Sequence, residues 1–370
     1  MIELIQSQAV MSNHQMSSTI RIIDANANRA AEALRVVEDY LRFHQNDAHL
    51  SRITKEIRHQ LSQTLAAHFP DRQLCRSTST DVGTNNQTLA EYQRASLAHI
   101  VIANMRRCTE ALRTLEEYSK LVDSTPAREF ESLRYRAYTL EKCLGHLERG
   151  TAALQNARLY VLIDLRYGFE TEYVDRLRQM LDAGVHVVQL RDKQASDREL
   201  IHAGKITKSV LASFKEALTP EAQRPLLIMN DRPDLACIVE ADGVHVGQEE
   251  VSVTEARSVV GPDRLVGVST HSVQQARAAV DGGADYIGVG PVFPSRTKQF
   301  EEFVGTELVH EVSSTTSLPS FAIGGITSDT LPVVLESGAK RVAVSNAIWG
   351  ADCVTDAVER FNSQWKTRIS

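Results

Sequence analysis

The feature that most constrains the fold is a series of eight short apolar segments that begins after Arg158. Each is five to eight residues long, is rich in Val, Ile and Leu, and contains or is followed by glycine or polar residues. Helical stretches such as 173–183 and 273–282 separate most of them. Alternation of this kind is typical of a parallel sheet buried on both faces. The segments are 159–164, 185–192, 225–231, 243–247, 265–270, 286–292, 320–326 and 341–347.

Eight strand–helix units within roughly 210 residues fit a closed barrel better than an open sheet, as in the (β/α)8 fold. The sequence therefore predicts an α/β protein with a TIM barrel. In this fold the chemistry lies at the carboxyl ends of the strands. We expect the functional residues there.

The first 150 residues follow a different pattern, with few glycines and long helical periodicity. The motif N-x-x-R-x-x-E-A-L-R starts at Asn26 and again at Asn104, 78 residues later. Both copies are rich in strong helix formers. Ala30, Ala33, Leu34, Val37 and Leu41 form an apolar stripe at helical spacing in the first copy. We expect a smaller all-α domain with an internal repeat.

A third helix is expected from Thr125-Pro126 to about Gly150, since proline is favoured in the first helical turn. A chain of 370 residues exceeds what one core usually organises. The predicted organisation is a disordered N-terminus (1–17), a helical domain (18–150), a linker (151–157) and the barrel (158–365).

Composition excludes several classes of protein. A net charge of −6 gives no support for binding nucleic acid or a membrane surface. No apolar run approaches the roughly 18 residues of a membrane span, and residues 1–20 do not resemble a signal peptide. The five cysteines are scattered and form no CxxC pair. We expect a cytoplasmic protein that acts on small molecules, and a homo-oligomer is compatible with the sequence.

Charged residues gather at the predicted strand ends and suggest an anion site. Arg191 and Lys193 lie at the end of the second strand and Lys298 follows the sixth, and they would converge on one diphosphate in a barrel. Asp231 and Glu250 would supply oxygen ligands to a magnesium ion, which binds through one or two carboxylates together with substrate phosphates. A second, monophosphate site is expected after strands 7 and 8, where Gly324 and Gly325 allow backbone N–H groups to approach.

Taken singly, each of these residues has an ordinary structural interpretation. A lone Arg or Lys is usually solvated, Asn-Asp-Arg is usually a turn, and Gly-Gly is usually tight turn geometry. We expect His245 to serve in packing and assign no chemistry to His271. The functional interpretation depends on the ordered set.

That ordered set, QLRDK, NDR, GVHVGQ, GVSTHS, GPVFPSRTK, AIGGI and VSNAI, resembles thiamine-phosphate synthase across the whole barrel. The resemblance implies an enzyme that joins hydroxymethylpyrimidine diphosphate to carboxythiazole or hydroxyethylthiazole phosphate. The products would be thiamine phosphate and diphosphate, with one Mg²⁺ per site. A covalent enzyme intermediate is not suggested, because no Ser–His–acid or Cys–His pair is evident.

The resemblance also implies roles for individual residues. The pyrimidine diphosphate contacts would be Gln189, Leu190, Arg191, Asp192, Lys193, Asn230, Ser269 and Lys298, with Arg191, Lys193 and Lys298 as catalytic residues. The thiazole phosphate contacts would be Ser295, Arg296, Thr297, Gly325, Val344 and Ser345. The metal ligands would be Asp231 and Glu250. Glu250 departs from the family, which has aspartate there; Glu249 is the alternative ligand.

Three alternatives for the barrel remain open. A thiazole tautomerase of the same fold would not need the diphosphate and metal residues, which are present here. Another phosphate-binding isomerase or lyase would need a general acid–base pair, and no obvious pair is evident. A non-catalytic binding protein would hold ligand without turnover.

The repeated helical motif resembles a domain fused ahead of some thiamine-phosphate synthases and proposed to be a hydroxymethylpyrimidine-phosphate kinase. Asn26, Arg29, Asn104 and Arg107 would form its polar site, with 80–84 as a candidate loop. No GxxxxGK[ST] motif is present. The opposing interpretation is that Arg29, Glu32, Arg35, Glu38 and Arg42 form ion pairs along one helix. A purely structural or dimerising role is the third option.

Overall fold

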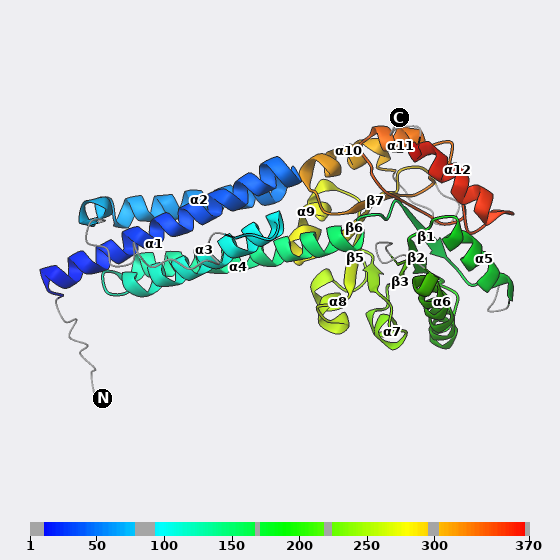
Figure 1. The fold of residues 1–370 in the computed structure, drawn as a ribbon, viewed down its shortest axis with the longest axis horizontal. Coiled ribbons are helices and arrows are strands. Elements are labelled where there is room, and N and C mark those ends of the chain that lie inside the picture. The colour runs from blue at the N-terminus through cyan, green and yellow to red at the C-terminus, as the bar shows by residue number, and fades with distance from the viewer. Residues whose placement is uncertain (1–10, 78–92, 167–170, 218–223, 295–302, 367–370) are drawn as a thin grey trace. The chain divides into compact units, whose positions relative to one another are not determined.

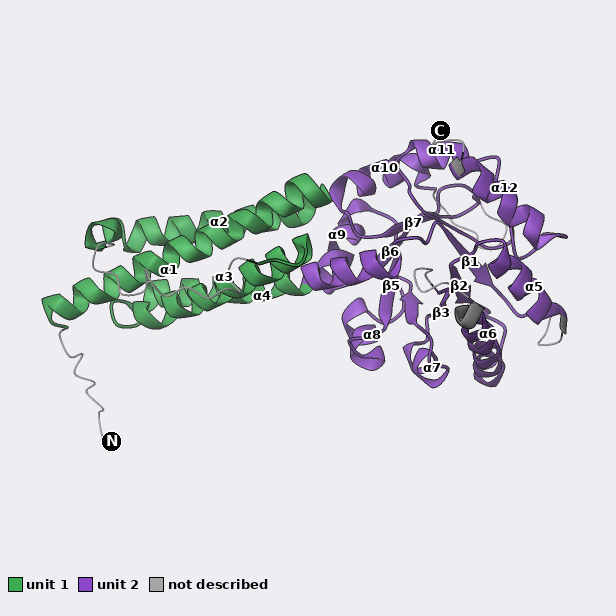
Figure 2. Ribbon diagram, viewed as in Figure 1, with its two compact units in different colours: residues 1–142 green, residues 143–370 purple. Residues whose placement is uncertain are grey.

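The computed structural model describes residues 11–77, 93–166, 171–217, 224–294 and 303–366. It divides into two compact units, residues 1–142 (unit 1) and 143–370 (unit 2), coloured separately in Figure 2. Among the described residues, no helix combines the length and apolar composition needed to cross a membrane.

Unit 1 consists of helices, as the periodicity predicts. The apolar stripe of the first repeat is buried in α1, and α1 packs along α3, which carries the second repeat. The helices are α1 (Asn13–Tyr40), a π-helical turn η1 (Leu41–Gln45), α2 (Ala48–His68), a 3-10 turn η2 (Arg72–Cys75), α3 (Leu97–Ser119) and α4 (Ser124–Ala153). Helix α4 is the one expected from Thr125-Pro126, and its last turns belong to unit 2.

The start of α1 corrects the expectation of disorder over residues 1–17. The helix begins at Asn13 because Ser12 and Gln15 form a capping box. The Gln15 backbone N–H donates to Ser12 Oγ (3.3 Å), and the Ser12 N–H donates to Gln15 Oε1 (3.0 Å). Such a box satisfies two N–H groups that would otherwise lack a partner. Residues 1–10 lie outside the described part of the chain.

Unit 2 is a closed barrel of eight parallel strands in the order β1 to β8, with helices around them (Figure 1). Val161 in β1 pairs with Val188 in β2 and with Val344 in β8, which closes the barrel. The strands are β1 (Leu159–Ile163), β2 (Val187–Leu190), β3 (Leu226–Asn230), β4 (Gly243–Val246), β5 (Leu265–Thr270), β6 (Tyr286–Val289), β7 (Ser320–Ile323) and β8 (Val342–Val344). The predicted TIM barrel is confirmed.

The helices of unit 2 follow the strands in turn, as the alternation predicts. They are α5 (Thr171–Asp182), α6 (Asp197–Ala217), α7 (Pro233–Ile238), α8 (Val253–Val260), α9 (Val273–Gly282), α10 (Gly305–Thr315), α11 (Leu331–Glu336) and α12 (Val354–Lys366). Inside the barrel, Tyr160, Tyr286 and Phe321 pack edge to face, with ring centroids 5.1 to 6.1 Å apart. Edge-to-face contacts of this kind are favourable for aromatic rings.

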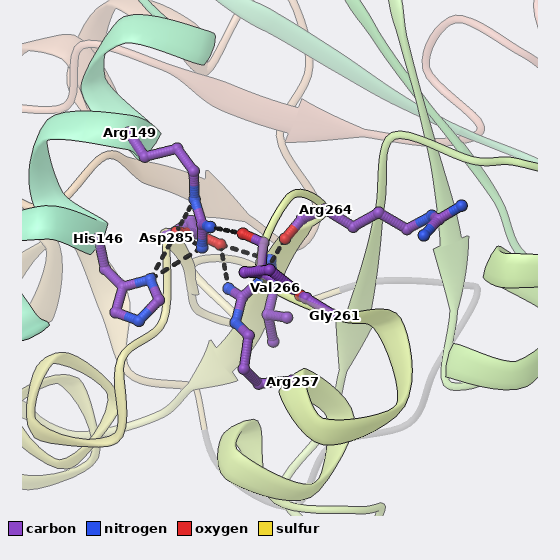
Figure 3. Close-up of polar contacts among 8 residues, drawn as sticks. His146, Arg149, Arg257, Gly261, Arg264, Val266 and Asp285 are labelled. Carbon is purple, nitrogen blue, oxygen red and sulfur yellow. Dashed lines mark hydrogen bonds and ion pairs between the residues drawn. The ribbon is translucent and has the colours of Figure 1, made fainter.

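The segment 151–157 is part of the barrel unit rather than a linker. It is helical to Ala153, and Leu154 and Ala157 are buried in the cluster that fills the barrel. Two residues of α4, His146 and Arg149, bond to Asp285 just before β6 (Figure 3). The sequence signal for a linker was the change of periodicity, and the structure shows that the helix end packs on the amino-terminal end of the barrel.

Candidate active site

A cavity of about 850 Å³ opens at the carboxyl ends of the barrel strands. Ten of the predicted site residues line it, although they come from widely separated parts of the chain. They are Gln189, Arg191, Lys193, Asn230, Asp231, Glu250, Ser269, Gly325, Val344 and Ser345. A cavity of this size suits substrates with a heterocycle and phosphate groups.

Strand β2 and the residues after it supply the first part of the site, because alternate side chains of a β-strand point to the same face. Gln189 and Arg191 line the cavity, whereas Leu190 between them does not and is 1% exposed. Asp192 does not line the cavity either. Its carboxylate accepts the backbone N–H groups of Leu165 (3.1 Å) and Gln194 (2.8 Å). Asp192 therefore holds the surrounding loops, while Arg191 and Lys193 supply positive charge to the cavity.

Two carboxylates, Asp231 and Glu250, face the same cavity. Burial and the negative charge of Glu250 raise the pKa of Asp231, and the hydrogen bond from Asn230 Nδ2 (2.6 Å) only partly opposes this. Asp231 has a φ of 59°, a region that is rarely populated by residues other than glycine and that clusters at functional sites. The Glu250 carboxylate folds over Gly247, where a Cβ would lie 2.1 Å from Glu250 Oε2 and would displace it.

The opposite rim of the cavity is built from glycines after β7. Gly324 and Gly325 both have positive φ (104° and 62°). A Cβ on Gly325 would lie 2.4 Å from the Pro294 carbonyl oxygen, so only glycine allows this close packing. Val344 and Ser345 complete this side. These residues line the cavity, and their role in binding a phosphate stays a prediction from the sequence.

Four predicted residues lie outside the described part of the chain: Ser295, Arg296, Thr297 and Lys298. The candidate loop of the helical domain, 80–84, also lies outside it. Their roles remain predictions from the sequence.

Sequence reasoning missed the floor of the cavity. Tyr160 and Tyr286 line it, but both stand within apolar strand segments that give no polar signal. His245, expected to serve in packing, is 8% exposed yet also lines the cavity. His271 lines it as well, and its Nδ1–H donates to the Gly290 carbonyl. Side-chain alternation along a closed barrel could have identified the two tyrosines as inward-facing.

The repeated motif of unit 1 places equivalent residues in equivalent contacts. Asn26 and Asn104 are both buried, and each donates its side-chain N–H to the carbonyl four residues earlier (2.9 and 2.8 Å). The Arg29 guanidinium lies 3.4 Å from Asn26 Oδ1.

The buried carboxylates of the two repeats are also equivalent. Glu38 of α1 is paired with Arg35 of the same helix, with Arg42 of the π-helical turn η1 that continues it, and with Arg58 of α2. In the second repeat, Glu116 is paired in the same manner by three cations, Arg113, Lys120 and Arg134. Ion pairs along the helix therefore account for Arg35, Glu38 and Arg42, as the structural interpretation expected.

The fold and this cavity define a (β/α)8 enzyme that handles anionic substrates at the carboxyl ends of its strands. Residues 159–348 match the family model described as thiamine monophosphate synthase. The chain is 42% identical over 350 residues to thiamine-phosphate synthase from Rhodopirellula baltica, covering 91% of this chain and 90% of the relative. It is 36% identical to the enzyme of the same name from Nostoc punctiforme, covering 93% of each. The chain belongs to the thiamine-phosphate synthase family.

Two further matches describe the separate units. Thiamine phosphate pyrophosphorylase from Pyrococcus furiosus superposes with a TM-score of 0.51 and 30% identity, covering 59% of this chain and all of that one. Residues 21–143 match the ThiD2 family. The chain thus joins a ThiD2-family segment to a thiamine-phosphate synthase barrel.

Proposed function

We propose that the barrel condenses hydroxymethylpyrimidine diphosphate with a thiazole phosphate and releases diphosphate. The carbon–oxygen bond to diphosphate breaks, and a bond forms between that carbon and the thiazole nitrogen. The observation that carries this proposal is the shared cavity. Arg191 and Lys193 lie on one side, and the open glycine backbone at Gly325 lies on the other.

The residues of the cavity act chiefly by position and charge. Arg191 and Lys193, together with Lys298, which follows β6 in the sequence, stabilise the negative charge that grows on the departing diphosphate. The aminopyrimidine itself bears the positive charge left on its carbon. The cavity walls hold the two reacting atoms near each other and exclude water, so the thiazole nitrogen captures this carbon.

We further propose that Asp231 and Glu250 hold Mg²⁺. Burial, and then repulsion from the Glu250 carboxylate, raises the pKa of Asp231, and a divalent cation held by the two carboxylates would relieve that repulsion. Among the described residues no cluster of three or more His, Cys, Asp or Glu could hold a metal. Mg²⁺ needs only one or two carboxylates when substrate phosphates and water complete its shell. When bound, it would neutralise diphosphate charge.

Production of thiamine phosphate from the two phosphorylated substrates with magnesium tests the reaction. We expect Lys298→Ala to lose most turnover while still folding, and near-normal turnover would refute its assigned role. A tautomerase-like barrel would convert the thiazole without releasing diphosphate.

The metal assignment has its own matched pair of variants. Glu250→Gln should raise the magnesium concentration needed for half-maximal rate at least tenfold, because one charged ligand is lost. Glu249→Gln removes a neighbouring carboxylate and should leave that concentration within about twofold. The reverse pattern would show that Glu249 is the ligand.

For unit 1, we propose the preceding step, phosphorylation of hydroxymethylpyrimidine phosphate. The match of residues 21–143 to the ThiD2 family favours it, and its product would be the substrate of the barrel. Asn26, Arg29, Asn104 and Arg107 are the candidate polar residues.

The full chain with ATP and hydroxymethylpyrimidine phosphate, without thiazole phosphate, should release ADP. Arg107→Ala should abolish this release. Arg113→Ala, which removes an arginine of the same motif that is paired with Glu116 and Glu117, should not. Absence of ADP from the wild-type chain would reject the kinase and leave a structural role.

A further inference from the structure

A chain of polar side chains crosses the floor of the barrel cavity. Gln189 Nε2 donates to the Tyr160 hydroxyl (2.7 Å), which lies 3.2 Å from the Tyr286 hydroxyl. The Tyr286 hydroxyl lies 3.3 Å from His245 Nδ1, and His245 Nε2 lies 3.0 Å from Ser269 Oγ. All but Ser269 are buried. This series of side chains therefore leads from the barrel interior to Ser269, which is partly exposed and lines the cavity.

The direction of these hydrogen bonds follows from the amide at the inner end. Gln189 Nε2 is the donor to the Tyr160 hydroxyl, an orientation that leaves Gln189 Oε1 buried without a hydrogen-bond partner among the described residues. With this orientation, we infer that the Tyr160 hydrogen is directed to Tyr286. On this inference the Tyr286 hydroxyl donates to His245 Nδ1. A neutral imidazole with an accepting Nδ1 carries its hydrogen on Nε2, which donates to Ser269 Oγ. The hydroxyl hydrogen of Ser269 is then left to point into the cavity.

Burial favours the neutral forms of the three titratable side chains in this series, Tyr160, Tyr286 and His245. Burial raises the pKa of the Tyr160 and Tyr286 hydroxyls. Burial, and then the charge of Arg191, lowers the pKa of His245 to about 4. Buried neutral groups of this kind form directional networks.

The strand backbone is shaped to hold the same arrangement. A Cβ on Gly267 of β5 would lie 2.1 Å from the Tyr286 ring. A Cβ on Gly288 of β6 would lie 3.4 Å from the His245 ring. Only a residue without a side chain at 267 lets the Tyr286 ring reach the position from which it meets His245.

Resting on the proposed function of the barrel, we propose that Tyr286 and His245 are positioning residues that hold the Ser269 hydroxyl as a hydrogen-bond donor toward the pyrimidine diphosphate. The substrate atom that meets Ser269 is thus an acceptor, such as a ring nitrogen or an ester oxygen. A substrate with an N–H at this position would meet a second hydrogen and would be rejected. Both residues line the cavity, and their proposed effect on the reaction passes through Ser269.

A double-mutant cycle tests this relationship. Tyr286→Phe should reduce kcat/KM about threefold to tenfold, the effect of one misdirected neutral hydrogen bond. Ser269→Ala should reduce it at least as much. The combined variant should be no slower than Ser269→Ala alone, because Tyr286 acts only through Ser269. Effects that multiply would overturn the proposal.

A matched control separates positioning from loss of packing. Tyr173 is also fully buried, and its hydroxyl lies 2.7 Å from Thr207 Oγ1 between α5 and α6, its one hydrogen-bond partner in the described part of the chain. It does not line the cavity. Tyr173→Phe should lower thermal stability about as much as Tyr286→Phe while kcat/KM stays within about twofold of wild type. A loss of turnover as large as that of Tyr286→Phe would show that the effect is structural.

The tautomer of His245 gives a readout that does not require turnover. Nitrogen-15 NMR of the labelled full chain at neutral pH, with His245→Asn to assign the signal, should show the hydrogen on Nε2. Tyr286→Phe should shift this signal, whereas Ser269→Ala should leave the tautomer unchanged. A hydrogen on Nδ1 in the wild-type chain would overturn the proposal, even if no thiamine phosphate were formed. An inactive wild-type chain with the expected tautomer would refute the proposed function alone.

Discussion

Replacement of Asp285 by asparagine should destabilise the barrel without touching its cavity. Asp285 is 0% exposed at the amino-terminal end of β6. Its Oδ1 accepts from Arg149 Nη2 (2.6 Å), and its Oδ2 accepts the Val266 N–H (2.7 Å) and a hydrogen bond from Arg257. The side-chain NH2 of an asparagine would replace one of the two accepting oxygens, so that donor would face donor at Arg149, Arg257 or the Val266 N–H. It would also leave the two guanidinium groups without a counter-charge (Figure 3).

The expected loss is about 3–5 kcal/mol, as found when one partner of a buried ion pair is removed. Both tryptophans, Trp349 and Trp365, lie in unit 2, so tryptophan fluorescence during denaturant unfolding reports on the barrel alone. The control is Asp197→Asn, whose carboxylate pairs with Arg232 but is 60% exposed, and it should cost less than about 1 kcal/mol. Equal losses for the two variants would refute the reasoning.

The pH dependence of this difference is a second check. Burial opposes ionisation, but His146, Arg257, the Val266 N–H and Arg149 together hold the pKa of Asp285 below its usual value. A depressed pKa gives stability that is complete above the unfolded pKa, about 3.9 for Asp, and is lost as pH falls through the folded pKa. The gap between wild type and Asp285→Asn should therefore narrow below about pH 4. Turnover of the folded variant should remain close to that of wild type.

Three further outcomes are expected. Gly150→Ala should destabilise the barrel in the same unfolding assay, because its Cβ would lie 1.9 Å from the Asp285 carbonyl oxygen. The control is Gly145→Ala on the same helix, whose Cβ would meet nothing within 4 Å and which should be neutral or stabilising. Iodoacetamide followed by mass spectrometry should modify exposed Cys353 readily but spare Cys108 until unfolding, since burial and then the charge of Glu141 raise the pKa of that buried thiol to about 12. Asp231→Asn should abolish turnover yet raise stability at pH 7 without magnesium, because the raised pKa of Asp231 means that its charged form opposes folding; a fall in melting temperature would contradict this.

The barrel could be predicted from the sequence because each strand carries its signal locally. The segment 265–270 coincides with β5, and the others extend one to three residues beyond a strand at one or both ends. For example, the predicted 341–347 contains β8 at Val342–Val344. The excess consists largely of flanking turn residues, such as Ser345, which line the cavity after the ladder has ended. The prediction thus located the site residues while overestimating the strands.

The Asp285 cluster could not have been predicted in this way. Its partners Arg149 and Arg257 lie 136 and 28 residues away along the chain. No local period links such residues, and an aspartate before a strand is ordinarily a turn residue. The two tyrosines of the cavity floor were missed for a local reason. Each stands among apolar residues of its strand, so nothing in the segment indicates that its hydroxyl group faces the cavity.

The same pair of hydrogen bonds, repeated at two aspartates, stabilises the amino-terminal end of the barrel. Asp242 and Asp285 directly precede β4 and β6. The backbone N–H of Asp242 donates to the carbonyl of Leu227 in β3, and that of Asp285 donates to the carbonyl of Val266 in β5 (both 2.8 Å). In return, each carboxylate accepts the backbone N–H of the same partner residue. The pKa of both aspartates is held below its usual value despite burial, so their charged forms favour the folded state.

At the carboxyl end of β3 the relation is reversed. Asp231 has a left-handed backbone, a like charge beside it and a raised pKa, so its charged form is held at the expense of stability. Such an arrangement persists only when the surrounding structure fixes it. In this barrel, Asp242 and Asp285 at the amino-terminal end hold in place the strands from which the cavity residues project. Loosening that end by Asp285→Asn should therefore lower the temperature at which turnover is lost while leaving its rate below that temperature unchanged.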